Sequence, residues 1–305
     1  MGEAGFSAPV LFVIFNRPDT TARVFQVIRQ AKPARLYIAA DGPREDKPGE
    51  GLKVQEVRAY VMGNIDWECE VKTLFRDKNA GCKRAVSGAI NWFFENEEEG
   101  IILEDDCLPD VSFFRFCMEL LEKYRHNERV MMISGNNFQS GAACSHSYYF
   151  SKYGGIWGWA SWRRAWLHYD VNMRRWPQVL GQGALNMADP PERLYWRRYF
   201  DLAFSGRLNT WDYQWIFTCW MMKGLSVMPA INLVSNIGFG QDSTHTKKGD
   251  HYVVALPKEG LSFPLRHPED VAVDRRADIV TRDLFYRLSV PRYVWMVAKG
   301  MIGWM

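Results

Sequence analysis

Several features that the 305-residue sequence lacks exclude classes of protein. No two of its six cysteines form a C-x-x-C pair, which argues against a structural zinc site. No apolar run approaches the roughly 20 residues of a membrane-spanning helix. The opening MGEAGFSAPV has neither the basic region nor the apolar core of a secretory signal. We therefore expect a cytoplasmic protein with free thiols.

Strong charge and glycine-rich phosphate loops are also missing. The formal net charge is only +3, so nucleic acid is not expected as a partner. No G-x-G-x-x-G follows the first apolar run, and neither G-x-x-x-x-G-K-[ST] nor G-x-S-x-G occurs. A bound diphosphate would therefore be held through a metal ion rather than in a glycine cradle.

What the sequence does contain is an alternation of apolar runs with stretches of helical periodicity. Continuous apolar runs are typical of strands buried on both faces. Their alternation with helices predicts an α/β fold, with a Rossmann-like, mostly parallel sheet flanked by helices. The expected strands cover residues 9–15, 35–42, 68–77, 100–106 and 130–135.

Polar residues gather where these strands end. Such sheets bind ligands outside the carboxyl ends of their strands, so these ends should meet at one crevice. They are Asn16-Arg17, Asp41-Gly42, Arg76-Asp77 and Glu104 to Asp106.

The segment GIILEDDCLP (100–109) runs from apolar residues straight into Glu104, Asp105 and Asp106. Adjacent carboxylates disfavour joint ionisation, so the cluster needs water or a cation. Asp106 is the expected ligand of Mn²⁺ or Mg²⁺, with diphosphate and water completing the shell. The alternative is that one of the two aspartates caps the following helix or turn. Glu104 and Asp105 either contact the donor and support the ligand, or are simply solvated.

Four segments of the first half resemble the GT-A fold of nucleotide-sugar-dependent glycosyltransferases. They are FNRPDTTARVF, IAADG, RDKNAGCKRAVSGAINWFF and ILEDD. The likeness is to the broad glycosyltransferase family 2, most closely to the N-acetylglucosaminyltransferase I type, over residues 9–245. It implies that Arg17 meets the nucleotide, that Asp41 reads the uracil or ribose, and that Asp106 ligates Mn²⁺. Asp41 could instead make an Asx-turn. Arg84 is a candidate phosphate contact near a helix N-terminus, or else part of a solvated helix face.

The second half resembles the aromatic acceptor lobe of the same family. In WDYQW, the W-D pair implies that Asp212 is the catalytic base of an inverting transfer; the alternative is a helix N-cap. Trp157 and Trp211 are candidates for stacking on the acceptor sugar. Trp159 is a third candidate, but for Trp159 and Trp162 burial in the core is the alternative. IGFGQDSTHT is similar to the loop that closes over the diphosphate, where His245 is a donor contact or merely solvated. The letters YQ replace a second Asp of close relatives, so the acceptor is not specified.

These observations divide the chain into a nucleotide-sugar-binding half (8–139), an acceptor-binding half of the same domain (140–250) and a C-terminal tail (251–305). The tail either docks on the core or lies on a membrane surface. The expected protein is a metal-dependent hexosyl- or N-acetylhexosaminyltransferase. It moves a sugar from a nucleoside diphosphate sugar, first of all a UDP-sugar, to a hydroxyl of a glycan or glycoconjugate.

Cell-envelope polysaccharide or lipopolysaccharide synthesis, in the cytoplasm or at the inner face of the membrane, would suit such an enzyme. Two other readings stay open. A sugar-nucleotide nucleotidyltransferase should carry a glycine-rich loop where NRPDTT stands. A catalytically inactive nucleotide-sugar- or glycan-binding module would need neither the E-D-D cluster nor the W-D pair.

Overall fold

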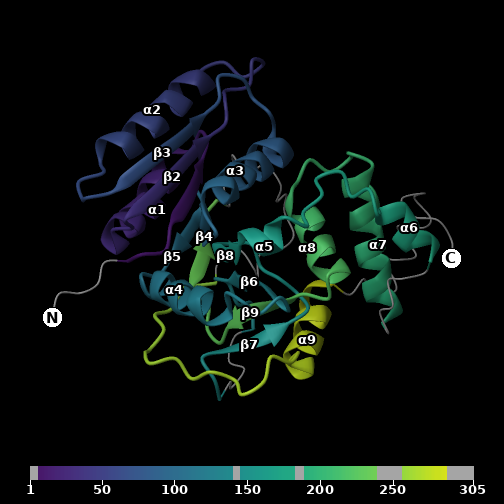
Figure 1. Ribbon diagram of the computed structural model, residues 1–305. Coiled ribbons are helices and arrows are strands. Elements are labelled where there is room, and N and C mark those ends of the chain that lie inside the picture. Colours follow the sequence, from purple (N-terminus) through teal and green to yellow (C-terminus); the bar gives the residue numbers. More distant parts are fainter. Residues whose placement is uncertain (1–5, 140–144, 183–188, 239–255, 287–305) are drawn as a thin grey trace.

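An eight-stranded sheet forms the centre of the computed structural model, which describes residues 6–139, 145–182, 189–238 and 256–286 (Figure 1). Its strand order is β3-β2-β1-β4-β8-β6-β9-β7. Four of the neighbouring pairs are parallel and three, at β4–β8, β6–β8 and β7–β9, are antiparallel. The strands are β1 (Val10–Ile14), β2 (Arg35–Ala40), β3 (Glu70–Phe75), β4 (Glu99–Glu104), β6 (Val130–Ser134), β7 (Tyr148–Ser151), β8 (Trp159–Trp162) and β9 (Leu225–Pro229).

Helices cover both faces of this sheet. Alternate residues of β1 point to opposite faces, as the pleat requires. Phe12 packs with Phe25 of α1 in one cluster, whereas Leu11 packs with Phe93 of α3 in another. The helices are α1 (Pro18–Ala31), α2 (Glu50–Gly63), α3 (Cys82–Asn96), α4 (Ser112–Tyr124), α5 (Arg163–Trp166), α6 (Trp176–Gly181), α7 (Pro190–Phe204), α8 (Asp212–Met221) and α9 (Arg275–Thr281), which continues into a π-helical turn, η1 (Arg282–Tyr286).

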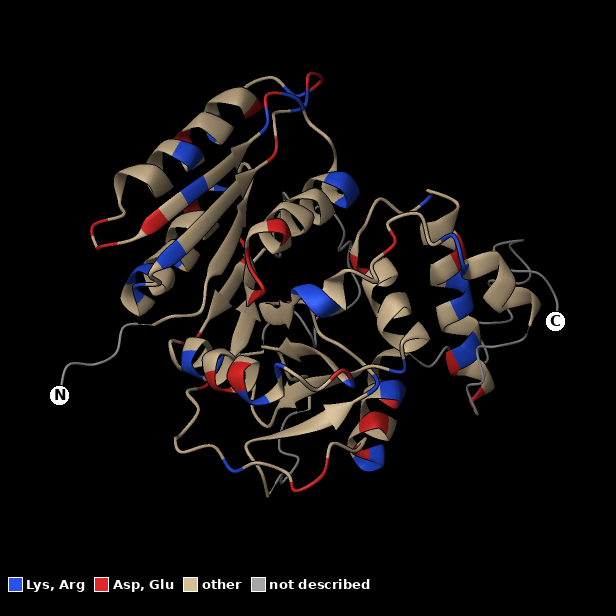
Figure 2. Cartoon of the chain, in the orientation of Figure 1, with Lys and Arg blue, Asp and Glu red and all other residues tan. Residues whose placement is uncertain are grey.

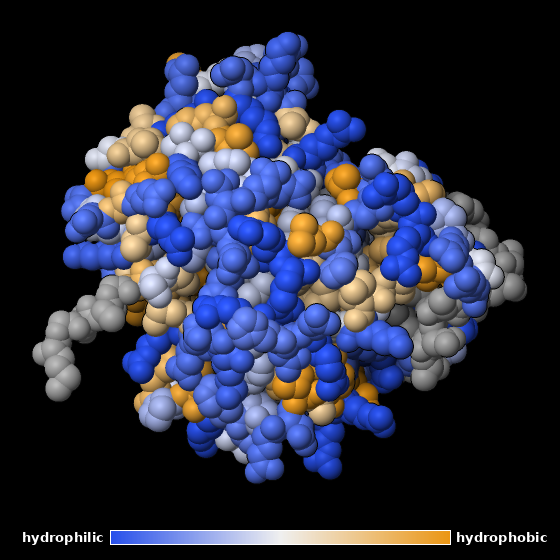
Figure 3. All heavy atoms as spheres, viewed as in Figure 1, coloured by the Kyte–Doolittle hydropathy of each residue, from blue (hydrophilic) through white to orange (hydrophobic). Residues whose placement is uncertain are grey.

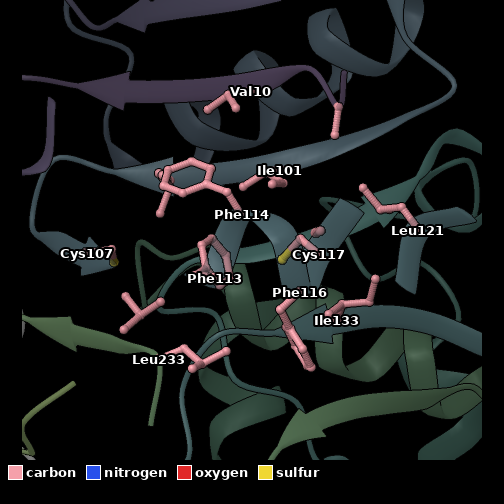
Figure 4. Packing of buried hydrophobic residues seen from close by; sticks show 14 of the residues in the cluster. Val10, Ile101, Cys107, Phe113, Phe114, Phe116, Cys117, Leu121, Ile133 and Leu233 are labelled. Atoms are coloured by element: carbon pink, nitrogen blue, oxygen red, sulfur yellow. The ribbon is translucent and has the colours of Figure 1, made fainter. Parts of the chain in front are cut away.

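The larger cluster lies between the sheet and α1, α2 and α4. Figure 4 shows side chains of α4, among them Phe113, Phe114 and Cys117, facing Val10 and Ile101 of the sheet. All five are at most 2% exposed. The predicted α/β fold, with a Rossmann-like sheet flanked by helices, is confirmed.

One part of the topology was not predicted. The run 130–135 was expected to continue the parallel set, but β8 lies between β4 and β6 and is antiparallel to both. Every residue of β8 is buried, so its sequence, WASW, has no polar–apolar alternation that would mark a strand. The aromatic second half of the chain therefore contributes a strand to the middle of the sheet.

A small second sheet ties a late segment to the end of β4. In it, β5 (Cys107–Pro109) pairs antiparallel with β10 (Val234–Asn236). The backbone N–H of Ile237 donates to the Asp106 carbonyl at 2.8 Å. Residues separated by about 130 positions therefore meet beside the carboxylate cluster.

The second half adds β7, β8 and β9 to the sheet, and its helices α6, α7 and α8 gather at one end of the molecule in Figure 1. They share an aromatic cluster that includes Trp176, Trp196 and Phe200. The helix expected near Glu192 to Phe204 is α7, whose N-cap Asp189 accepts a hydrogen bond from the Glu192 N–H.

The described part of the C-terminal region, residues 256–286, lies against the body of the protein. Asp274 N–H donates to the Phe150 carbonyl at 2.8 Å, and Ser151 Oγ donates to Asp278 Oδ1 at 2.5 Å. The ring of Tyr286 packs 4.6 Å from that of Trp196. His245 and residues 287–305 lie outside the described residues.

Hydrophilic residues cover most of the face seen in Figure 3, and apolar residues occur there in small groups. The described residues contain no helix that is both long and apolar enough to cross a membrane.

Candidate functional site

The carboxyl ends of β1, β2 and β4, three adjacent parallel strands, meet at one edge of the sheet. Arg17 follows β1, Asp41 follows β2, and Glu104 to Asp106 end and follow β4. Sequence reasoning predicted this convergence, because parallel strands end at the same edge.

Arg17 binds both aspartates of the cluster. Its Nη1 lies 2.6 Å from Asp106 Oδ2 and 3.5 Å from Asp105 Oδ1. Asp105 also accepts the Phe15 N–H at 3.0 Å, which joins the end of β4 to the end of β1. Burial lowers the pKa of Arg17, but Asp105 and then Asp106 outweigh it, so the pKa is raised overall. The arginine is the positive partner of the cluster.

One arginine faces three carboxylates. Burial first, and then the charge of Asp106, raises the pKa of Asp105 to about 7. Burial followed by the charges of Asp106, Asp105 and Asp212 raises the pKa of Glu104 well above its usual range. Within the described residues, no hydrogen bond reaches the Glu104 carboxylate. Three carboxyl groups therefore share one positive partner, and their raised pKa values mean that protons relieve part of their repulsion when no cation is bound.

The two structural alternatives for the aspartates find no support. The helix after the cluster, α4, begins only after β5, and its first N–H, that of Ser112, donates to Asp110 rather than to Asp105 or Asp106. Asp105 is 6% exposed, so it is not merely solvated.

Gly238 lies against Asp106. A Cβ placed on Gly238 would lie 2.8 Å from Asp106 Cβ and 2.9 Å from Asp106 Cγ, closer than real carbon contacts. The segment after β10 therefore approaches the carboxylate through a residue without a side chain. The sequence placed a late loop near the diphosphate, but it gave no sign that this glycine touches Asp106.

Asp41 is bound by backbone N–H groups of two segments. Both of its carboxylate oxygens are engaged by backbone: Oδ1 accepts from Gly42 N–H and both accept from Ala80 N–H at 3.0 Å, while Oδ2 also accepts from Gly81 N–H at 3.1 Å. An Asx-turn would need the N–H of residue 43, which is a proline, so that alternative is not formed. The side chain instead anchors the loop before α3. Asp41 is 8% exposed, and its contact to the nucleotide stays a prediction.

The first turn of α3 is basic and faces the same edge. Figure 2 shows its blue Lys and Arg positions at one end of the helix. Arg84 is exposed, and its side chain makes no hydrogen bond or ion pair with any described residue, so its phosphate contact stays a prediction. Cys82, which sequence reasoning passed over, lies within electrostatic range of the carboxylates. Burial and the charges of Glu104, Asp212, Asp106 and Asp41 raise the pKa of its thiol to about 12.

Asn209 joins the second half of the chain to α3. Its Oδ1 accepts the Lys83 N–H at 3.2 Å, and Gly81, with φ of +78°, approaches its side-chain amide. This contact holds the segment before α8 next to the crevice. The contact explains how Asp212 comes within electrostatic range of Glu104, although the two residues are far apart in the sequence.

Asp212 is the first residue of α8, and its Oδ1 accepts a short hydrogen bond from Thr210 Oγ. The N-cap is Trp211, and no side-chain capping bond is made, so the capping alternative for Asp212 is wrong. Burial first, and then nearby groups that include Asp212, raise the pKa values of Tyr169, Tyr195 and Tyr286. Asp212 therefore lies within electrostatic range of both Glu104 and this group of tyrosines.

The two tryptophans predicted to bind the acceptor differ in environment. Trp211 is 2% exposed and stacks on Trp159, with ring centroids 5.6 Å apart, so its ring has no free face for a sugar. That prediction is corrected: Trp211 is core. Trp157 is only half-buried and meets the Phe138 ring edge-on at 5.0 Å, and its acceptor role stays a prediction.

Comparison with known proteins identifies no family. No family model and no curated protein matches this chain. Two crystal structures of HddC from Yersinia pseudotuberculosis, one described as complexed with GMP-PN, align at 8% and 9% identity with a TM-score of 0.33. The alignments cover 52% of this chain and 77% of HddC. A likeness this weak carries no inference about function, which has to come from the residues of the site.

Proposed function

We propose that this protein is a metal-dependent, inverting glycosyltransferase of the GT-A type that uses a nucleoside diphosphate sugar, with UDP-sugars as the first donors to test. One observation carries the proposal. At the carboxyl edge of the sheet, three clustered carboxylates share a single arginine, and a fourth carboxylate, Asp212, lies within electrostatic range. A cation that arrives with its ligand would replace the protons that such clustered carboxyl groups otherwise hold.

The donor set of the crevice fits a hard divalent ion. Mg²⁺ and Mn²⁺ are bound by one or two carboxylates, with phosphate and water completing the shell. Asp106 would hold the ion, with Asp105 and Glu104 behind it. The described residues contain no group of three or more His, Cys, Asp and Glu side chains that could bind a metal alone, so the diphosphate would have to complete the shell. The bound ion would offset charge on the leaving diphosphate.

Asp212 is the proposed general base. As the acceptor oxygen bonds to the anomeric carbon, the bond from that carbon to the diphosphate breaks and the hydroxyl proton passes to Asp212. The products are the glycoside, with inverted configuration, and the nucleoside diphosphate. The hydrogen bond from Thr210 and the position at the start of α8 fix the carboxylate, so it can take the proton without first being ordered.

A thermal-shift panel tests the donor site. Nucleoside diphosphates and their sugars are added with and without Mn²⁺ to wild type and to Asp106→Ala. A ligand at about 100 times its Kd stabilises the folded state by roughly 2.7 kcal/mol. We expect UDP or a UDP-sugar to raise the Tm of wild type only with Mn²⁺, and Asp106→Ala to lose the effect. No shift with any nucleotide would refute the proposal.

Asp212→Asn tests the base on the same protein. It should bind UDP and Mn²⁺ like wild type. The rate of sugar transfer from the donor found above should fall by about 10²- to 10⁴-fold, as measured by the release of the nucleoside diphosphate. Unchanged turnover would refute the assignment of Asp212. Release of pyrophosphate instead of nucleoside diphosphate would indicate a nucleotidyltransferase.

A further inference from the structure

Arg17 uses only part of its guanidinium to hold the carboxylates. Both of its contacts, to Asp106 and Asp105, are made by Nη1, and within the described residues neither Nη2 nor Nε donates a hydrogen bond. The side chain is 24% exposed, against 8% for Asp105 and 19% for Asp106. Because a guanidinium carries five N–H donors, Arg17 can bind a second anion that enters the crevice.

The contact to Asp106 is also the one that a metal ion would need. Nη1 lies 2.6 Å from Asp106 Oδ2, on the outer aspartate of the pair. A divalent cation on the same oxygen would sit about 2.1 Å away, so it would meet the positive guanidinium at very short range. Arginine does not give up its proton to relieve this repulsion. Arg17 and a metal ion therefore compete for Asp106.

We propose that Arg17 is an exchangeable counter-ion that makes metal binding depend on the nucleotide. Without ligand, Arg17 neutralises Asp106 and keeps divalent ions weakly bound. When a nucleoside diphosphate enters, the guanidinium turns to its phosphate oxygens, for which its planar fork is suited, and Asp106 becomes free for the ion. The inference rests on the proposed donor site but goes beyond it, since it assigns Arg17 a role in the order of binding.

A definite linkage follows. If the nucleotide strengthens Mn²⁺ binding by some factor, Mn²⁺ strengthens nucleotide binding by the same factor. Part of that factor comes from removing Arg17 from Asp106. Replacing Arg17 by a neutral residue should therefore strengthen Mn²⁺ binding to the ligand-free protein and shrink the coupling.

The test is a titration with Mn²⁺, monitored by the EPR signal of the free ion, with and without UDP. Wild type is compared with Arg17→Gln, which removes the charge, and with Arg17→Lys, which keeps it. Arg29→Gln is the matched control, because Arg29 lies at the other end of α1 and pairs with Asp66 at the surface. Circular dichroism checks that each variant is folded.

We expect Arg17→Gln to bind Mn²⁺ without nucleotide at least tenfold more tightly than wild type, and UDP to improve its Mn²⁺ affinity by a smaller factor. For Arg17→Lys and Arg29→Gln, the Mn²⁺ affinity without nucleotide should stay within about threefold of that of wild type. Equal Mn²⁺ affinity of ligand-free Arg17→Gln and wild type would overturn the exchange, even where UDP binds wild type with Mn²⁺. The converse result, tighter Mn²⁺ binding by Arg17→Gln but no UDP binding by wild type, would support the competition and refute the proposed donor.

Discussion

Replacing Gly238 by alanine should disturb the carboxylate cluster without removing any of its charges. The new Cβ would lie 2.8 Å from Asp106 Cβ, and 3.4 Å is the near limit of ordinary contact, so the two segments must separate by about 0.6 Å. Rotating the Asp106 side chain cannot relieve this clash, because its Cβ moves only with the backbone. The strain falls on the link from Ile237 N–H to the Asp106 carbonyl.

Two effects of Gly238→Ala are expected. Overpacking of this kind costs about 1–3 kcal/mol of unfolding free energy, which should lower the Tm by several degrees. Moving Asp106 by about half an ångström also spoils its position toward the ligand, and we expect the Kd of UDP with Mn²⁺ to rise at least tenfold. Calorimetric titration measures the Kd and differential scanning the Tm.

Gly63→Ala is the control for this substitution. Gly63 ends α2, and a Cβ there has nothing within 4 Å. It should leave UDP binding unchanged and stabilise the protein slightly. If Gly238→Ala binds UDP and Mn²⁺ within twofold of wild type, the contact between Gly238 and Asp106 does not position the site.

Two further predictions concern the other carboxylates. A pKa of about 7 for Asp105, against 3.8 for the free residue, means that the folded state holds a proton which the unfolded state releases, so the metal-free protein should lose stability as pH rises from about 4 to 7. Asp105→Asn should remove up to about 4 kcal/mol of that loss, and urea unfolding of both proteins at pH 4.5 and pH 8 would measure it. If the unfolding free energy of wild type and variant changes equally with pH, Asp105 does not hold this proton. Asp41→Asn turns an amide donor toward the N–H groups of Ala80 and Gly81, so it should cost about 2–4 kcal/mol and speed hydrogen exchange at both amides. Unchanged exchange there would show that Asp41 does not anchor the loop.

Much of the first half could be predicted because local pattern and topology agree. Apolar runs gave the strands, and the rule that parallel strands end at one edge brought Arg17 close to Asp105 and Asp106. Both steps depend on residues near each other in the sequence or on the sheet itself.

The parts that could not be predicted depend on contacts across the chain. The sequence around Asp41 gives no sign that its carboxylate accepts three backbone N–H groups. An aspartate after a strand and before a glycine has the same sequence pattern whether it binds a nucleotide or a loop. Trp211 was predicted to stack on the acceptor sugar because WDYQW resembles the acceptor lobe of the family. It is buried instead, and it stacks on Trp159 of an antiparallel strand that was not predicted. Asp212 reaches the crevice through Asn209 and α3, a contact without any sequence pattern.

The most direct test of the central claim is a crystal grown with UDP and Mn²⁺ and measured at a wavelength where manganese scatters anomalously. The account predicts one manganese peak in contact with Asp106 and the diphosphate, with the Arg17 guanidinium turned from Asp106 to a phosphate oxygen. A structure in which UDP is bound while Arg17 still holds Asp106 and no manganese lies at the cluster would contradict it.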